Sequence, residues 1–177
     1  MHIHWSIMLS KLEKLLNSMK IFIGTDHAGY VLKEKLMSSL KAQGYEIIDK
    51  GAYEYNEGDD YPDFVVPVAR EVYKDPNNVK GIILGATGEG EAITANKFPH
   101  IRAVAYYGQS KCIVDDEADI IVRSRQHNNT NILSLGARYL TEETMMKAVD
   151  LWLNTPFSEG ERHIRRLGKI DQIRIND

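Results

Sequence analysis

The sequence predicts an α/β fold in which a mostly parallel sheet of five strands carries helices on both faces. Short apolar runs, typical of buried strands, alternate along the chain with stretches of helical character. The chain has 177 residues, a length suited to one domain, and 43% of them are hydrophobic, enough to build one sizeable core. No internal repeat or interdomain linker interrupts the alternation. The expected architecture is therefore a three-layer sandwich.

Five apolar runs are expected as strands, and helices are expected between and after them. The strands are Lys20 to Gly24, Tyr45 to Asp49, Lys80 to Gly85, Arg102 to Tyr106 and Asn131 to Leu135. The helices run from about Tyr30 to Gln43, Asp63 to Tyr73, Glu91 to Lys97, Thr141 to Leu153 and Glu161 to Ile170. Ligands of such sheets bind beyond the carboxyl ends of the strands. We expect the segments at 24–29, 85–91 and 126–131 to meet there in one cleft.

The first 18 residues stand outside this pattern, because Met19 to Gly24 resembles a first strand that begins at its own methionine. The leader is either a start-site artefact or a docked helix with an apolar face. We divide the chain into an N-terminal extension (1–18), a main domain (19–170) and a C-terminal tail (171–177).

Composition and charge exclude several classes of protein. The formal net charge of −3 gives no broad basic surface for nucleic acid, although a basic cluster between Arg162 and Arg174 suits a small phosphate. The single cysteine, Cys112, excludes an internal disulfide and a multi-cysteine metal site, and agrees with a cytoplasmic location. No apolar run approaches the roughly 18 residues of a membrane helix, so neither membrane insertion nor export is expected.

The glycine-rich segment Gly85-Ala86-Thr87-Gly88-Glu89-Gly90-Glu91 follows an expected buried strand and opens a helix. Backbone N–H groups converge at such a turn and stabilise an anion, and a tight strand-to-helix turn is the alternative explanation of the glycines. Neither common nucleotide fingerprint is present, which argues against an ATP or NAD site. Glu91 places a proton acceptor beside a site for developing negative charge, a pairing that suits enolisation. A solvated glutamate in a first helical turn is the plainer interpretation.

Further polar residues stand near the expected strand ends. Asp26 and His27 follow the first strand, where they either reach a ligand or serve as a helix cap and a surface histidine. The acids of Asp59-Asp60-Tyr61-Pro62-Asp63 are best explained as helix caps, whereas Tyr61 is a candidate to line a cleft. His27, His127 and His163 are too scattered to indicate a metal site, and we expect no metal.

Arg162 and Arg166 are four residues apart, so they share one face of an expected helix. Two guanidinium groups at this spacing either converge on a phosphate or belong to a solvated basic face. Arg138, just beyond the last expected strand, adds a third candidate.

Taken in order, these segments resemble the ribose-5-phosphate isomerase B family. The resemblance runs from Met19 to about Ile170. It rests on Gly24 to Gly29, Asp60 to Asp63, Gly85 to Glu91 with Ala95-Asn96-Lys97, His127-Asn128, Leu135 to Arg138, and Thr155-Pro156-Phe157 with Arg162-His163 and Arg166. It implies a Rossmann-like fold and a homodimer or homotetramer with sites shared between subunits. It also implies no cofactor, and interconversion of ribose 5-phosphate and ribulose 5-phosphate in the pentose phosphate pathway.

The resemblance also implies roles for individual residues. In many members a cysteine that ends the strand before the glycine loop is the base, but here that position is Gly85. The chain is instead similar to the branch in which a glutamate after the loop, Glu91, is the base. His127 opens the sugar ring, and Thr87 completes the catalytic set. The implied substrate contacts are Asp26, His27, Tyr61, Ala86, Gly88, Glu89, Gly90 and Asn128, with Arg138, Arg162 and Arg166 at the phosphate.

Two departures bear on substrate choice. Ala86 and Glu89 vary the glycine loop, and the segment 108–125 is longer and more acidic than the family pattern. Isomerisation of another sugar phosphate, of the galactose 6-phosphate type, and a non-catalytic phosphosugar-binding module are the alternatives.

Overall fold

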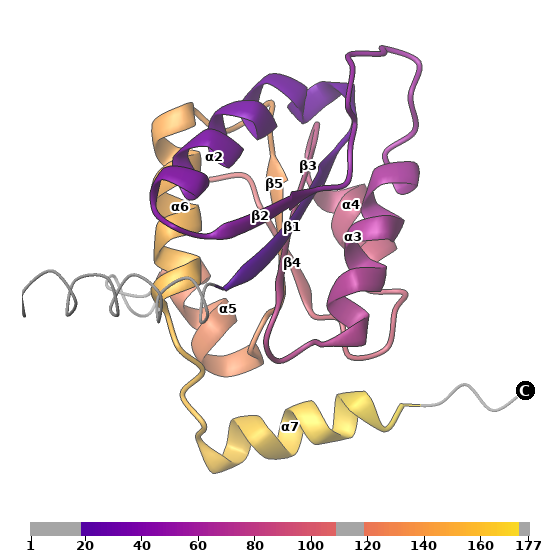
Figure 1. Cartoon of the computed structure of the whole chain (residues 1–177). Coiled ribbons are helices and arrows are strands. Elements are labelled where there is room, and N and C mark those ends of the chain that lie inside the picture. Colours follow the sequence, from indigo (N-terminus) through magenta and orange to yellow (C-terminus); the bar gives the residue numbers. More distant parts are fainter. Residues whose placement is uncertain (1–18, 109–118, 174–177) are drawn as a thin grey trace, which may run out of the picture.

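The computed structural model describes residues 19–108 and 119–173, and it confirms the α/β class (Figure 1). All strand pairings in its five-stranded sheet are parallel, in the order β2-β1-β3-β5-β4. The strands are β1 (Lys20–Thr25), β2 (Glu46–Asp49), β3 (Lys80–Gly85), β4 (Ala103–Tyr106) and β5 (Ile132–Gly136). Each expected strand agrees with these bounds to within one residue at either end.

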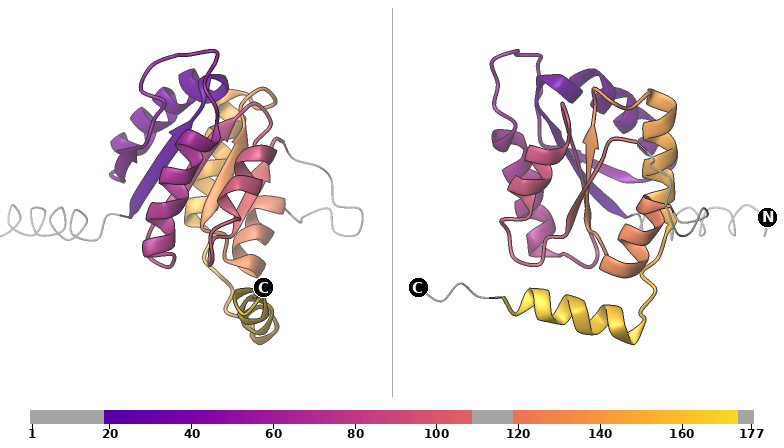
Figure 2. Two further views of the ribbon diagram at one scale, coloured as in Figure 1. Left: turned by 90° about the vertical axis from the view of Figure 1, so that its right-hand side faces the viewer. Right: turned by 180° about the vertical axis from the view of Figure 1, so that it is seen from behind.

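Helices cover both faces of the sheet, which makes the three layers visible in Figures 1 and 2. One face carries α2 (Tyr30–Ala42), α5 (Ile120–Asn128) and α6 (Glu142–Asn154), packed around a core that includes Leu36 and Trp152. The other face carries α3 (Pro62–Lys74) and α4 (Glu89–Ala95), with Val65 and Val68 in a second core. The central strand β3 contributes to both cores, because its alternate side chains point to opposite faces. None of the helices among the described residues is long and apolar enough to cross a membrane.

Helix α5 is absent from the helices that the sequence predicts. The helix is capped by Asp119, whose carboxylate accepts hydrogen bonds from the N–H groups of Ile121 (2.7 Å) and Val122 (3.3 Å). Its buried positions include Ser124 and Arg125, so polar side chains face the protein interior. A helix is recognised in a sequence by its apolar stripe. Polar residues interrupt that stripe in α5, so the sequence pattern does not predict the helix.

The last helix, α7 (Glu161–Asp171), extends below the body of the molecule as an arm (Figures 1 and 2). It buries His163 and Leu167, whereas Ile164 and Ile170 are each 53% exposed. The arm thus presents apolar as well as basic side chains outside the body of its own chain.

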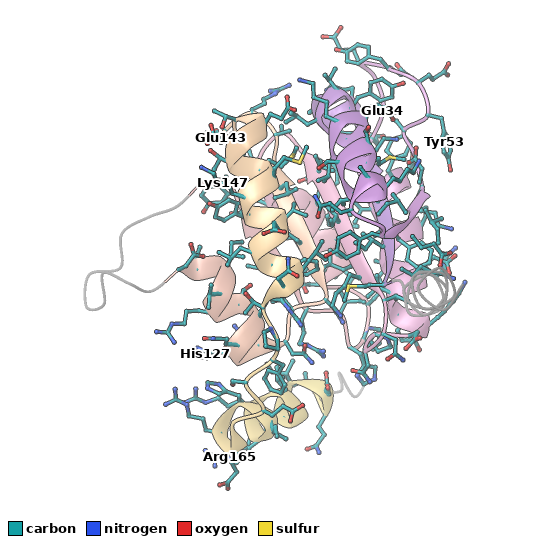
Figure 3. All side chains as sticks on the ribbon, turned by 60° about the vertical axis from the view of Figure 1, so that its left-hand side comes forward. Glu34, Tyr53, His127, Glu143, Lys147 and Arg165 are labelled. Carbon is teal, nitrogen blue, oxygen red and sulfur yellow. The ribbon has the colours of Figure 1, made fainter. Side chains whose placement is uncertain are left out.

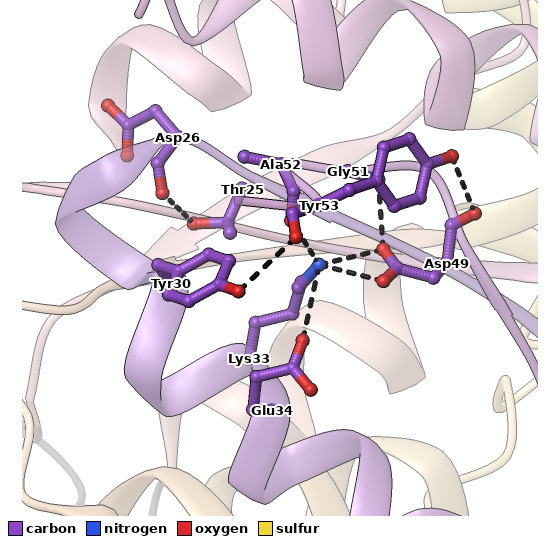
Figure 4. Close-up of polar contacts among 9 residues, drawn as sticks. All are labelled: Thr25, Asp26, Tyr30, Lys33, Glu34, Asp49, Gly51, Ala52 and Tyr53. Carbon is purple, nitrogen blue, oxygen red and sulfur yellow. Dashed lines mark hydrogen bonds and ion pairs between the residues drawn. The ribbon is translucent and has the colours of Figure 1, made fainter. Parts of the chain in front are cut away.

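A buried lysine fixes the segment that connects β2 to α3 (Figure 4). The ammonium of Lys33, which is fully buried, donates hydrogen bonds to both carboxylate oxygens of Asp49 (2.9 and 2.8 Å) and to the carbonyl of Ala52 (2.6 Å). A buried ammonium must satisfy its donors within the protein, so these partners hold the start of the segment in one place. The far end of the same segment carries Asp59 and Tyr61.

Candidate active site

The carboxyl ends of β1, β3 and β5 gather the first half of the candidate site. Asp26 follows β1, the glycine loop follows β3, and Arg138 follows β5. Strand-like pairing continues into the loop, since the N–H of Ala137 bonds the carbonyl of Gly85 (2.8 Å) and that of Arg138 bonds the carbonyl of Ala86 (3.1 Å). The Arg138 side chain is exposed at this edge. The expected grouping at the carboxyl edge is confirmed for these segments.

At two positions of the loop, Gly88 and Gly90, the structure explains why the residue is glycine. Gly88 adopts φ 81°, the left-handed region that favours glycine, and it lies against the backbone of β5. A Cβ on Gly90 would come 2.8 Å from the Tyr61 hydroxyl, so this glycine lets the tyrosine lie over the loop. Tyr61 therefore reaches the site, as expected from the sequence. Thr87 and Glu89 are exposed on the loop, and the Glu89 N–H donates to the Thr87 hydroxyl (3.2 Å).

The Glu91 side chain is turned inward, toward the end of β3. The residue is only 4% exposed, so the interpretation as a solvated glutamate is wrong. A Cβ built on Gly85 would overlap the Glu91 carboxylate, with Oε1 the nearest atom. The carboxylate thus fills the volume that any side chain at position 85 would need. Helix α4 begins at Glu89, two residues earlier than expected, and this places Glu91 in its first turn, facing back to the loop.

Burial raises the pKa of the Glu91 carboxyl above its ordinary value, and the nearby Asp26 carboxylate raises it further. The backbone N–H groups of Glu91 and Gly88 bond the carboxylate and partly offset this rise in its pKa. A carboxylate with a raised pKa is a stronger base than an exposed one. The group also lies against Gly85, at the start of the glycine loop.

Asp26 and His27 lie at the end of β1, within the same edge. The Asp26 carboxylate accepts a hydrogen bond from the Ala28 N–H (3.0 Å), so it caps the short helix η1 (His27–Gly29), as one of the two interpretations proposed. It is nevertheless only 6% exposed, and burial raises its pKa. It also lies close enough to Glu91 to raise the pKa of that carboxyl.

Asp59 does not cap α3, and the capping interpretation is wrong for this residue. The N-cap of α3 is Tyr61, with no side-chain hydrogen bond to the helix. The Asp59 carboxylate instead bonds His27, through Nδ1 (2.7 Å) and through the backbone N–H (3.1 Å). Sequence reasoning missed this contact because 32 residues separate the partners and only the fold brings them together.

Asp26, His27 and Asp59 also offer ligand atoms that lie within 4.8 Å of one another. Carboxylate oxygens and an imidazole nitrogen are a donor set suited to a divalent cation such as Zn²⁺ or Mn²⁺. The hydrogen bond to Asp59 already engages Nδ1 of His27, which leaves Nε2 as the open ring nitrogen. The expectation of a metal-free site stays a prediction.

The second half of the candidate site lies at the opposite edge of the sheet. His127 and Asn128 end α5, and the chain then enters β5 at its amino end. The carbonyl of Asn131 accepts a hydrogen bond from the N–H of Gly81, at the start of β3. Figure 3 shows His127 beside α7 and far from Glu143, which marks the start of α6 near the carboxyl edge.

The expected meeting of all three segments in one cleft is therefore wrong within a single chain. A segment that precedes a strand must lie at that strand's amino end, and a five-residue strand spans about 16 Å. Arg162 and Arg166 are exposed on α7, at the same distant edge as His127. Each chain carries two half-sites that face different directions.

His127 and His163 stack in parallel at this second half-site, with ring centroids 4.3 Å apart and planes at 8°. Nε of Arg162 donates to Nε2 of His163 (3.1 Å), so that nitrogen is an acceptor without a proton. Burial and the surrounding guanidinium groups lower the pKa of both imidazoles. The half-site is thus rich in arginine, and its surroundings favour the neutral form of both histidines. His163 was part of the sequence motif but not among the candidate residues.

Comparison with known proteins identifies the family of the chain. The Ribose/Galactose Isomerase family matches residues 21–170. Ribose-5-phosphate isomerase B of Escherichia coli (strain K12) is 39% identical over 154 residues, which cover 87% of this chain and 95% of that protein. The Mycobacterium tuberculosis (strain ATCC 25618 / H37Rv) protein of the same name is 38% identical over 153 residues, 86% of this chain and 88% of that one.

Solved structures give the same result. Ribose-5-phosphate isomerase B from Mycoplasma genitalium, with bound ribulose-5-phosphate, aligns with a TM-score of 0.77 at 35% identity, over 88% of this chain and 95% of that one. The Clostridium thermocellum enzyme aligns with a TM-score of 0.73 at 43% identity, over 87% and 96% of the two chains. By sequence and by structure, this chain belongs to the ribose/galactose isomerase family.

Proposed function

We propose that the protein is an aldose-ketose isomerase that interconverts ribose 5-phosphate and ribulose 5-phosphate through a cis-enediolate. The observation that carries this proposal is the buried Glu91 carboxylate, directed at the end of β3 and joined to the glycine loop. Relatives 35–39% identical over most of the chain bear this enzyme's name. The reaction belongs to the pentose phosphate pathway, and we expect it to take place in the cytoplasm.

Glu91 removes the proton from C2 of the open-chain sugar and returns it to C1. As the proton leaves, negative charge develops on the carbonyl oxygen, and we expect N–H groups of the loop between Ala86 and Gly90 to stabilise it. One such donor is typically worth about 3 to 4 kcal/mol in the transition state. Asp26, His27 and Tyr61 bind the sugar from the neighbouring strand ends, and the Thr87 hydroxyl completes the loop.

A complete site requires two chains in this proposal. Arg162, Arg166 and His127 lie at the edge opposite Glu91, so a partner related by a two-fold axis brings its second half-site to the first. The partner's arm α7 then offers guanidinium groups to the phosphate. His127, whose pKa is lowered by burial and by Arg123, Arg162 and Arg166, is neutral and can accept the ring hydroxyl proton during ring opening.

Turnover measured across a panel of phosphorylated sugars tests the proposal. We expect ribose 5-phosphate to be isomerised, with exchange of the C2 proton for solvent deuterium. Galactose 6-phosphate in the panel tests the alternative substrate class. Tight binding of ribose 5-phosphate without any exchange at C2 would instead indicate a phosphosugar-binding module.

Replacement of Gly85 by alanine should abolish most of the activity while the fold survives. The new methyl group takes the volume of the Glu91 carboxylate, and the flexible glutamate side chain turns away to make room. A misplaced catalytic group costs about 100-fold in kcat/KM for a shift of roughly an ångström. Measurement of kcat/KM checks the loss of activity, and a thermal melt of the same preparation checks that the fold is retained. Gly168→Ala is the matched control, because a Cβ there meets no atom within 4 Å.

The pH dependence of kcat/KM should report the buried base. Because burial raises the pKa of Glu91, the rate rises with pH along a limb centred above the ordinary glutamate value of about 4.3. A profile measured with ribose 5-phosphate checks this prediction. An acid limb at or below the ordinary value would contradict the assignment of a desolvated carboxylate as the base.

A further inference from the structure

The Asp59 carboxylate bonds His27, and neither helix capping nor a gain in folding free energy accounts for this contact. Its side chain is only 8% exposed, and Oδ1 accepts hydrogen bonds from both Nδ1 and the backbone N–H of His27. Its other oxygen, Oδ2, is buried and has no hydrogen-bond partner among the described residues. An unpartnered buried carboxylate oxygen costs free energy of folding, so the residue is poorly suited to a purely structural role.

We propose that Asp59 is a positioning residue that fixes the orientation and the tautomer of His27 for the sugar phosphate. This inference rests on the proposed function, because it assigns His27 to the substrate. Asp59 itself acts only through the histidine.

The argument begins with the proton on Nδ1. An ionised carboxylate can only accept hydrogen bonds, so the nitrogen that faces it at 2.7 Å must carry the proton. Nε2 is then turned away from Asp59 and makes no hydrogen bond within the described part of the chain. The histidine side chain is 21% exposed, which leaves that nitrogen accessible to a ligand. A free neutral imidazole would more often carry its proton on Nε2, so the carboxylate selects the less common form.

The orientation of the ring is fixed from two sides. The Tyr55 ring meets the His27 ring edge-on, with centroids 6.3 Å apart and an angle of 84°. Asp59 engages both the side chain and the backbone of His27, so that the ring cannot rotate without the loss of a hydrogen bond. Both contacts come from the segment between β2 and α3, whose start is anchored by Lys33.

The direction of the ring matters because of the acids around it. Asp26 adjoins His27 in sequence, and Asp26 in turn adjoins Glu91. A ligand nitrogen of His27 lies within 4.8 Å of the Asp26 carboxylate, so a ring released from Asp59 can pair with Asp26 instead. With Nδ1 held by Asp59, the ring keeps the orientation that leaves Nε2 open to the sugar phosphate.

Two variants at position 59 separate the roles of the oxygen and of the charge. Asp59→Ala removes the acceptor, and we expect kcat/KM for ribose 5-phosphate to fall by about 100-fold, the loss typical of a misplaced group. Asp59→Asn keeps an acceptor oxygen of the same reach, so its loss should be clearly smaller. Glu57→Gln is the control, since it removes an exposed negative charge from the same segment and should leave kcat/KM unchanged.

Nitrogen-15 NMR of histidine-labelled protein gives a readout that a structural role would not move. In the wild-type protein, with the His27 signal assigned by its loss in His27→Gln, Nδ1 should show the shift of a protonated nitrogen. In Asp59→Ala the Nε2-protonated form should appear. An unprotonated Nδ1 in the wild type would overturn the proposal even if no variant at position 59 folds. Near wild-type kcat/KM in Asp59→Ala, or an Asp59→Asn loss equal to that of Asp59→Ala, would also overturn it.

The two proposals fail in different ways. A wild-type protein without isomerase activity contradicts the proposed function, whatever the NMR signal of His27. An active wild type whose His27 tautomer does not depend on Asp59 contradicts only the inference drawn from Asp59.

Discussion

Glu91→Gln should lower kcat/KM for ribose 5-phosphate by about 10²- to 10⁴-fold, the contribution usual for a general base. The amide has the shape of the carboxylate but cannot accept the C2 proton. Substrate binding should change little, because the loop amides and the arginines remain. Stopped assays of ribulose 5-phosphate formation measure the loss, and retention of near-normal isomerisation would exclude Glu91 as the base.

The same variant should be at least as stable as the wild type at neutral pH. Since the pKa of Glu91 is raised in the folded protein, the folded state holds its proton to higher pH than the unfolded state. Stability therefore falls as pH rises through the interval between the unfolded and folded pKa values, and the penalty persists above it. Glutamine has no such penalty. Thermal melts of both proteins across this range check the sign, and a variant less stable than wild type at neutral pH would contradict it.

Two inactive variants should restore activity when they are combined in one dimer. Glu91→Gln disables the half-site at the carboxyl edge, whereas Arg162→Ala with Arg166→Ala disables the half-site on the arm. In a mixed dimer, one site receives both lesions and the other receives neither. The isolated mixed dimer therefore keeps one intact site of its two, so its activity should return to about half of the wild-type value.

Co-expression with two affinity tags and isolation of the doubly tagged dimer provide the measurement. The control carries Glu91→Gln and both arginine substitutions in the same chain, paired with itself, and it should stay inactive. If the mixed dimer stays as inactive as its two parents, the sites are not shared between subunits. The result therefore tests the dimer and the placement of the arginines together.

The strands could be predicted from the sequence because parallel strands covered on both faces are short and uniformly apolar. The loop between Gly85 and Glu91 was recognised for a related reason, since glycines at a strand end signal a close approach of the backbone. Helix α5 was missed because Ser124 and Arg125 face the interior, where apolar residues are expected. The segment 1–18, the acidic run Asp115-Asp116-Glu117 and Cys112 lie outside the described residues, so those predictions stay open.

The site was harder to predict than the fold. Glu91 was selected by its position, but its burial follows from the missing side chain at Gly85, six residues earlier. Asp59 was assigned to capping because local sequence favours local partners, whereas its partner is a histidine on a different strand end. The separation of His127 from Glu91 follows from the direction of β5, which sequence motifs alone do not reveal.

The shared volume of Gly85 and Glu91 constrains how this enzyme can evolve. Some glycine codons differ from a cysteine codon by one nucleotide, so a single mutation can introduce a thiol at position 85. The thiol and the Glu91 carboxylate would need the same space, so the carboxylate would have to move away from the end of β3. Under the role proposed above for Glu91, one substitution would thus exchange a carboxylate for a thiol at the end of β3.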